Sequence, residues 1–351
     1  MVFCYCKVID FIVQIWYNNF IHNHYKRDWR VVMIFEKQVV NMFKGMMHTR
    51  CDDTETVFYF SSDDFPGLKK EAYSFKASAG HTLQGYLYCY GNPIEGRLLV
   101  FDHGFGGGHR AYMKEIELLC RHGFLVLAYD HTGCMESGGE TPNGFAQSLC
   151  DLNDCISAVK KDARFAGLDI SVMGHSWGAF STMNISALHP EISHIVAMCG
   201  FVSPTEIVGT FFSGILKGYR KAVLELEKQS NPEFFGFNAV ESLSKSDVKA
   251  LLIYSEDDAM CKKVHYDIIK KGLEGKENVR LMLVEGKGHN PNYTADAVKL
   301  LGEFGAARAK LARKKNATKE EKAAFVASYD WNAMTAQDEG IWKAIFEHLD
   351  A

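Results

Sequence analysis

Between about residue 73 and residue 305, short apolar runs alternate with stretches whose apolar residues recur every three or four positions. The short runs are typical of buried strands, and the three- or four-residue spacing is typical of helices with one apolar face. Alternating strands and helices form βαβ units, so the sequence predicts an α/β fold with a mostly parallel twisted sheet and helices on both faces. Strands are expected at 83–90, 97–102, 124–129, 170–173, 194–198, 248–254 and 279–284, and helices at 111–121, 145–159, 177–189, 263–272 and from about 294.

Length and composition agree with a soluble globular protein. The 351 residues suffice for one large domain with an insertion, and 47% are hydrophobic and 23% charged. A formal net charge of −4 gives no electrostatic footprint for nucleic acid, so we expect no nucleic-acid partner. The ten cysteines are scattered without a disulfide pattern, which indicates free thiols in a reducing compartment and predicts a cytoplasmic location.

The stretch M-G-H-S-W-G at 173–178 follows the predicted strand at 170–173 and precedes a predicted helix. A serine on a sharp strand-to-helix turn has a strained backbone with neighbouring chain close by. Gly174 and Gly178, two residues before and after Ser176, remove the side chains that would clash there. A serine that merely caps the helix is the alternative. The context favours Ser176 as a nucleophile.

A serine hydroxyl needs a base to accept its proton. His289 lies in a glycine loop directly after the last predicted strand, which distinguishes it from the other thirteen histidines. The imidazole in turn needs a carboxylate that holds its tautomer. Three acids, Glu256, Asp257 and Asp258, follow the strand at 248–254, and composition does not choose among them. The order serine, acid, histidine is that of the α/β-hydrolase arrangement.

Backbone N–H groups are also required to stabilise an oxyanion. Trp177, the residue after the candidate nucleophile, supplies one at the start of a helix. The loop H-G-F-G-G-G at 103–108 is the expected source of the second, because its glycines let the backbone come near a ligand. A phosphate cradle is the alternative, but neither P-loop nor G-x-G-x-x-G spacing is present. We expect no cofactor, and no metal at the C-x-C of Cys4 and Cys6.

Several motifs together resemble the α/β-hydrolase superfamily in their order and spacing. The closest branch is that of the serine aminopeptidase-like, lysophospholipase and monoacylglycerol lipase-like hydrolases, and the likeness spans about 73–305. The motifs are H-G-F-G-G-G at 103–108, D-H-T-G at 130–133 with S-G at 137–138, G-H-S-W-G at 174–178, S-E-D-D at 255–258 and G-K-G-H at 286–289.

The resemblance implies an α/β-hydrolase fold with a helical cap and assigns roles by position. Phe105 would supply an oxyanion amide beside that of Trp177, with His103, Gly104, Gly174 and Gly178 in support. Asp258 would be the acid, although Ser255 replaces the family's usual glycine, and Asp257 is the reserve. Met135 replaces a glycine of the D-x-x-G-x-G-x-S loop; since that loop is structural, the replacement leaves the expected chemistry intact.

Two segments flank the expected hydrolase core at 70–305, and a third is inserted within it. The N-terminal extension at 1–45 has an apolar stretch at 11–17 and a basic one at 24–27. We favour an upstream extension of the reading frame, with a natural start near Met33, over a helix that contacts a membrane interface. The insertion at 201–246 is the expected cap, and the tail at 306–351 is expected to hold helices that pack on the body or on a second subunit. Thr318 and Glu321 form a predicted capping box.

Within the cap, one apolar helix face is expected either to pack on the core, to line an acyl pocket, or both. Its residues are Val208, Phe211, Phe212, Ile215, Tyr219 and Val223.

The expected activity is hydrolysis of carboxylic esters with a small to medium hydrophobic acyl group, so the expected partner is a small acyl substrate. A serine aminopeptidase, an acyltransferase and a non-catalytic binding protein on the same scaffold are the alternatives. An aminopeptidase needs an acidic pocket for the substrate amine, and Glu206 is the lone candidate in the cap.

Overall fold

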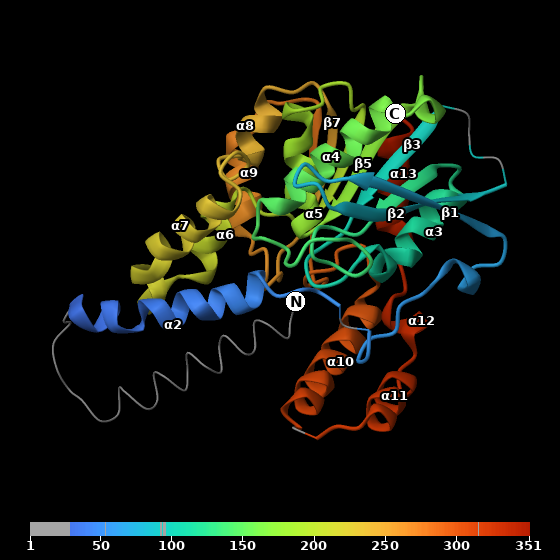
Figure 1. Ribbon diagram of the computed structural model, residues 1–351. Helices are drawn as coiled ribbons and strands as arrows, with labels where there is room; N and C mark the ends of the chain where they lie inside the picture. Colours follow the sequence, from blue (N-terminus) through green and yellow to red (C-terminus); the bar gives the residue numbers. More distant parts are fainter. Residues whose placement is uncertain (1–28, 53, 92, 94–95, 315) are drawn as a thin grey trace.

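The computed structural model describes residues 29–351 apart from 53, 92, 94–95 and 315. A single eight-stranded sheet in the order β1-β2-β4-β3-β5-β6-β7-β8 forms its centre (Figure 1). β1 and β2 are antiparallel, β2 and β4 are antiparallel, and the remaining pairs are parallel. The strands are β1 (Leu68–Lys76), β2 (Thr82–Tyr90), β3 (Arg97–Asp102), β4 (Leu125–Tyr129), β5 (Asp169–His175), β6 (His194–Met198), β7 (Lys249–Ser255) and β8 (Val279–Val284).

Helices cover both faces of this sheet. One face carries α3 (Met113–Arg121) and α13 (Glu339–Leu349), whose apolar residues share one core with the sheet. The other face carries α4 (Gln147–Lys161), α5 (Trp177–Asn184), α8 (Ala239–Ser244) and α9 (Val264–Gly272), which share the larger core. The predicted α/β fold is confirmed: all seven predicted strands are present, with ends within two residues of the prediction.

The edge strand β1 was not predicted. It pairs along its whole length with β2, from Leu68 opposite Tyr90 to Lys76 opposite Thr82. Four consecutive residues of β1 are exposed, from Lys69 to Ala72, so the strand lacks the continuous apolar run by which the central strands are identified.

The segment after β6 forms a group of helices at one end of the sheet. Here lie α6 (Pro204–Phe211), the 3₁₀ helix η5 (Gly214–Tyr219) and α7 (Arg220–Ser230), after which the chain returns to the sheet face with α8. The prediction of a single helix is wrong, but the expected packing on the core is confirmed for five of its six residues: Val208, Phe211, Phe212, Tyr219 and Val223. The chain breaks around Gly214, whose φ of 58° is left-handed, and Ile215 is consequently 69% exposed while Val208 and Val223 are buried.

The N-terminal segment also differs from expectation. α2 (Trp29–Met47) runs through the boundary expected at residue 45 and lies against the cap, beside η5 and α7 (Figure 1). Val39, Phe43 and Met47 of this helix are buried in the larger core. The segments at 11–17 and 24–27, and the C-x-C motif, lie outside the described residues.

The C-terminal region belongs to the body of the molecule. α10 (Ala295–Arg313) continues through the boundary expected at 305/306 and is followed by α11 (Lys319–Ala327), α12 (Trp331–Met334) and α13. Both hydrogen bonds of the capping box between Thr318 and Glu321 are present at the start of α11. Ile341, Ile345 and Leu349 of α13 are buried against the sheet. Across the described part of the chain, no helix combines the length and apolar character needed to cross a membrane.

Candidate active site

Ser176 lies on the sharp turn between β5 and α5. Its φ of 58° and ψ of −111° are in a region that residues with side chains rarely adopt. A Cβ on Gly174 would stand 2.4 Å from the carbonyl oxygen of Gly178, and one on Gly178 would stand 2.1 Å from that of Asp102. The two glycines are therefore needed because backbone passes within contact distance on either side of the serine.

His289 and Asp258 complete a chain of hydrogen bonds that begins at Ser176. The Ser176 hydroxyl donates to His289 Nε2 at 2.8 Å, and His289 Nδ1 donates to Asp258 Oδ2 at 2.7 Å. Asp258 follows β7, and His289 lies in the loop after β8. The order and contacts are those of a serine nucleophile, a base and an orienting acid.

The surroundings of Asp258 favour its ionised form. Burial by itself would raise the pKa of this carboxyl, but the His289 imidazole and the backbone amide of Met260 outweigh burial and hold the pKa below 3.8. The other oxygen of Asp258 accepts from the amides of Met260 at 2.7 Å and Cys261 at 3.1 Å, which fixes the direction of the carboxylate.

The two neighbouring acids have other environments. Glu256 is exposed. Asp257 accepts from the Ser255 hydroxyl at 2.7 Å and from the amides of Lys287 and Gly288, both at 3.2 Å. Asp257, the reserve acid, therefore holds the loop that carries His289 instead of contacting the imidazole. Ser255, which departs from the family motif, supplies one of these bonds.

Phe105 and Trp177 flank Ser176 in the same pocket, with their rings edge to face at 5.2 Å. Trp177 is the first residue of α5, where backbone N–H groups have no acceptor within the helix. Phe105 lies in the loop after β3. The amides of both residues are thus candidates for an oxyanion hole beside the serine.

The supporting residues hold the loop that leads to Phe105. His103 Nδ1 donates to the carbonyl of Gly104 at 2.8 Å, and its Nε2 accepts from the His131 amide at 2.9 Å. Burial, then the nearby His131, lowers the pKa of His103 to about 3, so this ring is neutral. The Gly104 amide donates to the Tyr112 hydroxyl at 3.1 Å.

His175, inside the motif, was not predicted to contribute. Its Nε2 donates to the backbone carbonyl of His289 at 2.6 Å, and its Nδ1 accepts from the Tyr112 hydroxyl at 2.8 Å. Burial, then the neighbouring His289, lowers the pKa of His175 to about 3. The neutral ring therefore connects the His289 loop with Tyr112, which contacts the loop after β3. The sequence signal that could have identified His175 was its position between Gly174 and Ser176 in the motif.

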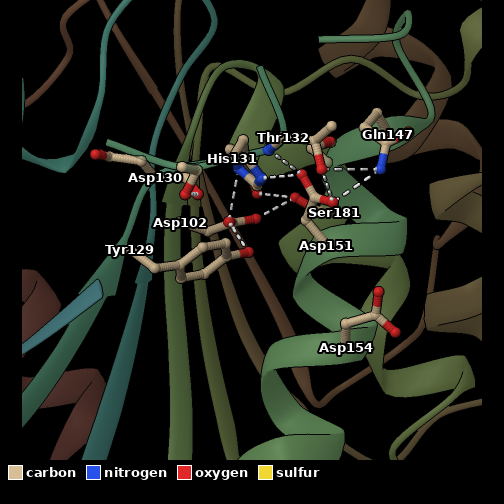
Figure 2. Close-up of polar contacts among 12 residues, drawn as sticks. Asp102, Tyr129, Asp130, His131, Thr132, Gln147, Asp151, Asp154 and Ser181 are labelled. Carbon is tan, nitrogen blue, oxygen red and sulfur yellow. Dashed lines mark hydrogen bonds and ion pairs between the residues drawn. The ribbon is translucent and has the colours of Figure 1, made fainter. Parts of the chain in front are cut away.

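A second polar network lies behind the site, and sequence reasoning also missed it (Figure 2). His131 is fully buried and forms ion pairs with Asp102 at 2.9 Å and Asp151 at 3.1 Å. Burial would lower its pKa, but the two carboxylates raise it to about 9, so His131 is a cation at neutral pH. The sequence signal that could have revealed this network was an acid, Asp151, within the apolar pattern of the helix predicted at 145–159.

This network connects several elements of the site. Asp102, at the end of β3, accepts from the Tyr129 hydroxyl at 2.7 Å and from Ser181 on α5. Asp151, on α4, accepts from the Thr132 amide at 2.8 Å and from Gln147 at 2.8 Å (Figure 2). The loop bearing Phe105 and the helix bearing Trp177 are therefore fixed to the same buried cation.

An apolar pocket opens beside Ser176. Residues of the core, the cap and α2 contribute to it, and its surface is almost wholly apolar. Apart from Ser176 and the Cys261 thiol, the described residues of its lining offer only hydrocarbon, thioether and aromatic side chains, which suit an apolar ligand. The lining residues are Met46, Met47, Phe105, Phe145, Ser176, Trp177, Phe201, Ile207, Phe211, Met260 and Cys261.

One group of potential metal ligands was found among the described residues. The ligand atoms of Cys199, Asp258 and His289 lie within 4.8 Å of one another. The carboxylate and imidazole already bond to each other, and the Cys199 thiol hydrogen-bonds to Asp258. These contacts satisfy the three side chains within the chain itself.

Comparisons with known proteins agree with the fold. The molecule has the α/β-hydrolase fold: an esterase of Pyrococcus furiosus superposes on 75% of this chain and 98% of its own, with a TM-score of 0.54 and 19% identity. The model of the family described as serine aminopeptidase, S33, matches residues 95–283. The match covers just over half of the chain, which therefore belongs to this family of α/β hydrolases.

Two curated relatives have matching segments. Human monoglyceride lipase is 27% identical over 182 residues, which are 50% of this chain and 57% of that protein. A putative carbamate hydrolase of Agrobacterium fabrum is 27% identical over 100 residues, which are 28% of this chain and 36% of that protein. The chain thus spans less than two thirds of the length of either relative. The resemblance to the monoacylglycerol lipase-like branch is confirmed.

Proposed function

We propose that the protein is a serine hydrolase that cleaves carboxylic esters with a small to medium hydrophobic acyl group. The observation that supports this most directly is the chain of hydrogen bonds from Ser176 through His289 to Asp258, at 2.8 and 2.7 Å. The serine of this chain faces an apolar pocket.

The proposed reaction has two acyl-transfer steps. His289 Nε2 accepts the hydroxyl proton as Ser176 Oγ attacks the acyl carbonyl, and the Phe105 and Trp177 amides stabilise the oxyanion. The imidazolium then gives its proton to the departing alcohol, which leaves an acyl-serine. Water attacks this ester with His289 again as base, and the acid and free serine are released. Asp258 stabilises the imidazolium in both steps.

The pocket favours an ester substrate over an aminoacyl substrate. An aminopeptidase requires a negative group for the substrate amine, and none of the described residues that line the pocket beside Ser176 is acidic. Glu206, the candidate from the sequence, lies on α6 but does not line this pocket. An acyltransferase would use the same residues, with an alcohol in place of water.

A fluorophosphonate activity probe tests the nucleophile. The wild-type protein should be labelled at Ser176, and Ser176→Ala should lose labelling together with roughly 10⁴-fold or more of its esterase kcat. The matched control is Ser186→Ala, a buried serine in the 3₁₀ turn that follows the same helix. Wild-type protein that is folded but neither labelled nor active on any ester would support a binding protein instead.

Substrate class is then decided with p-nitrophenyl esters of increasing acyl length, assayed beside aminoacyl p-nitroanilides. We expect turnover of the esters and little of the amides. A preference for the aminoacyl amides would replace the esterase proposal with the aminopeptidase. Transfer to an added alcohol in preference to water would replace it with the acyltransferase.

A further inference from the structure

The helix α2 lies outside the region that the family model matches, yet its C-terminal half is part of the protein core. The family match begins at residue 95, and α2 ends at Met47. Phe43 is fully buried, and its ring lies 6.0 Å from the ring of Phe145 and 6.0 Å from that of Phe212. Phe145 precedes α4 and Phe212 follows α6, so the helix is packed between the core and the cap.

The chain directly after α2 is attached to the core by backbone hydrogen bonds. The Cys51 amide donates to the Gly133 carbonyl at 2.9 Å, and the Met135 amide donates to the Cys51 carbonyl at 2.9 Å. Met135 has a φ of 43°, at the position where the family has a glycine. The loop at 133–139 therefore serves as the attachment point of the N-terminal segment.

Arg50 strengthens this attachment. Its guanidinium donates to the backbone carbonyls of Met135, Ser137 and Gly139 at 2.6, 2.9 and 2.8 Å. Three charge-assisted bonds to one loop fix the end of α2 relative to the core. The last turn of α2 is thus held before it by the packing of Phe43 and after it by the bonds of Arg50 and Cys51.

This last turn contributes Met46 and Met47 to the pocket that contains Ser176. Met47 is 2% exposed, and Met46 is half-buried. Methionine is unbranched and adaptable, so it fills irregular space without offering a polar group. The other contributors are held by the sheet, α5 and the cap, and the two methionines complete the apolar wall.

We propose that α2 determines substrate selectivity: Met46 and Met47 set the size of the aliphatic acyl group that the pocket beside Ser176 accepts. The inference rests on the proposed esterase function and names its substrate class as esters of unbranched aliphatic acids whose length the two methionines limit. An apolar lining without a charged residue binds an aliphatic chain through burial alone. The volume of two side chains on α2 then limits how much chain is buried.

Variants that change this volume in both directions test the proposal. Met47→Ala and Met46→Ala enlarge the pocket, and Met46→Trp reduces it. The matched control is Lys37→Ala, an exposed position on the same helix. Measured quantities are kcat/KM for p-nitrophenyl acetate, butyrate, octanoate and decanoate, with thermal unfolding to verify that each variant is folded.

We expect the alanine variants to raise the ratio of kcat/KM for octanoate over butyrate roughly tenfold, the effect of burying about two additional methylenes. Met46→Trp should lower the ratio, and Lys37→Ala should leave it within twofold of wild type. Folded alanine and tryptophan variants that all keep the wild-type ratio would overturn the inference while leaving the esterase function intact.

Calorimetric titration with butyrate, octanoate and decanoate anions separates the two proposals. This measurement requires no turnover, so it is informative even if Ser176 does not react. We expect Met47→Ala to shift the tightest binding toward the longer acids. Absence of both probe labelling and esterase activity would refute the proposed function. An unchanged dependence of binding on chain length would refute the role of α2.

Discussion

Two imidazoles of this protein, His289 and His131, are each bonded to a carboxylate, but they differ in everything else around them. His289 bonds to one carboxylate and to the Ser176 hydroxyl, and its side chain is 16% exposed. His131 lies between two carboxylates, Asp102 and Asp151, and is fully buried. The first ring bonds to Ser176, which lines the apolar pocket, and the second lies behind the loop of Phe105 and the helix of Trp177.

The difference is the one expected between the proposed base, His289, and a structural imidazole, His131. A base must gain and lose a proton, so it needs one stabilising carboxylate and access to the reacting group. Two carboxylates around a buried ring keep it protonated at neutral pH, because they raise the pKa of His131 to about 9. The number of carboxylates and the exposure of the ring therefore decide the role, and the residue types alone do not.

The largest expected effect comes from removing the carboxylate of the reactive pair. Asp258→Asn should lower kcat about 10⁴-fold, because the amide no longer stabilises the imidazolium and can hold the wrong tautomer. Asp257→Asn is the matched control, since it changes the adjacent residue, which bonds to the His289 loop. Asp257→Asn should lower kcat far less than Asp258→Asn does. Equal losses of kcat in the two variants would contradict the assignment of Asp258 as the acid.

Removing the structural cation should affect stability more than chemistry. His131→Gln leaves Asp102 and Asp151 buried without their cation, which should destabilise the fold by about 3–5 kcal/mol. The variant should still be labelled by a fluorophosphonate probe wherever it remains folded. Chemical denaturation at neutral pH measures the loss. A variant as stable as wild type would contradict a protonated His131 between the two carboxylates.

The pH dependence of stability is a second test of whether His131 is a cation. The pKa of His131 is about 9 in the folded protein and 6.5 ordinarily. Its contribution is therefore fully present below pH 6.5 and is lost as the pH rises through about 9. The stability difference between wild type and His131→Gln should shrink over this interval. A difference that stays constant would contradict the assignment.

The smallest effect is expected at Glu227, a buried carboxyl that has no cationic partner among the described residues. One of its oxygens accepts from the Phe145 amide at 2.7 Å, and Oε1 has no hydrogen-bond partner in the described part of the chain. Burial raises the pKa of Glu227 to about 8, although the Phe145 amide opposes the rise. Glu227 thus shows how burial alone shifts the pKa of a group that, unlike His131, has no ion pair among the described residues.

Because the folded pKa is raised above 4.5, the neutral acid is compatible with the fold below pH 4.5, and its contribution is lost as the pH rises to about 8. Glu227→Gln should therefore raise the thermal midpoint at about pH 8 by a few degrees and change it little at about pH 4.5. Calorimetry of wild type and Glu227→Gln at the two pH values measures these thermal midpoints. A variant less stable than wild type at both would contradict this account.

The order of strands and helices could be predicted because central strands are continuous apolar runs and helices carry one apolar face. The same signals failed where burial was partial: β1 exposes four consecutive residues, and the cap helix breaks at Gly214. α2 was missed because its role comes from packing against the cap and the pocket, contacts between segments far apart in the sequence.

The sequence by itself determined the fold class, the strained position of Ser176 and the loops on which an acid and a base should lie, because periodicity and glycine spacing are local properties. Only the tertiary structure decided that Asp258 and not Asp257 meets His289, that His131 is held between two acids, and that Met46 and Met47 reach the pocket. These are distances between side chains from different elements, and they exist only once the elements have packed.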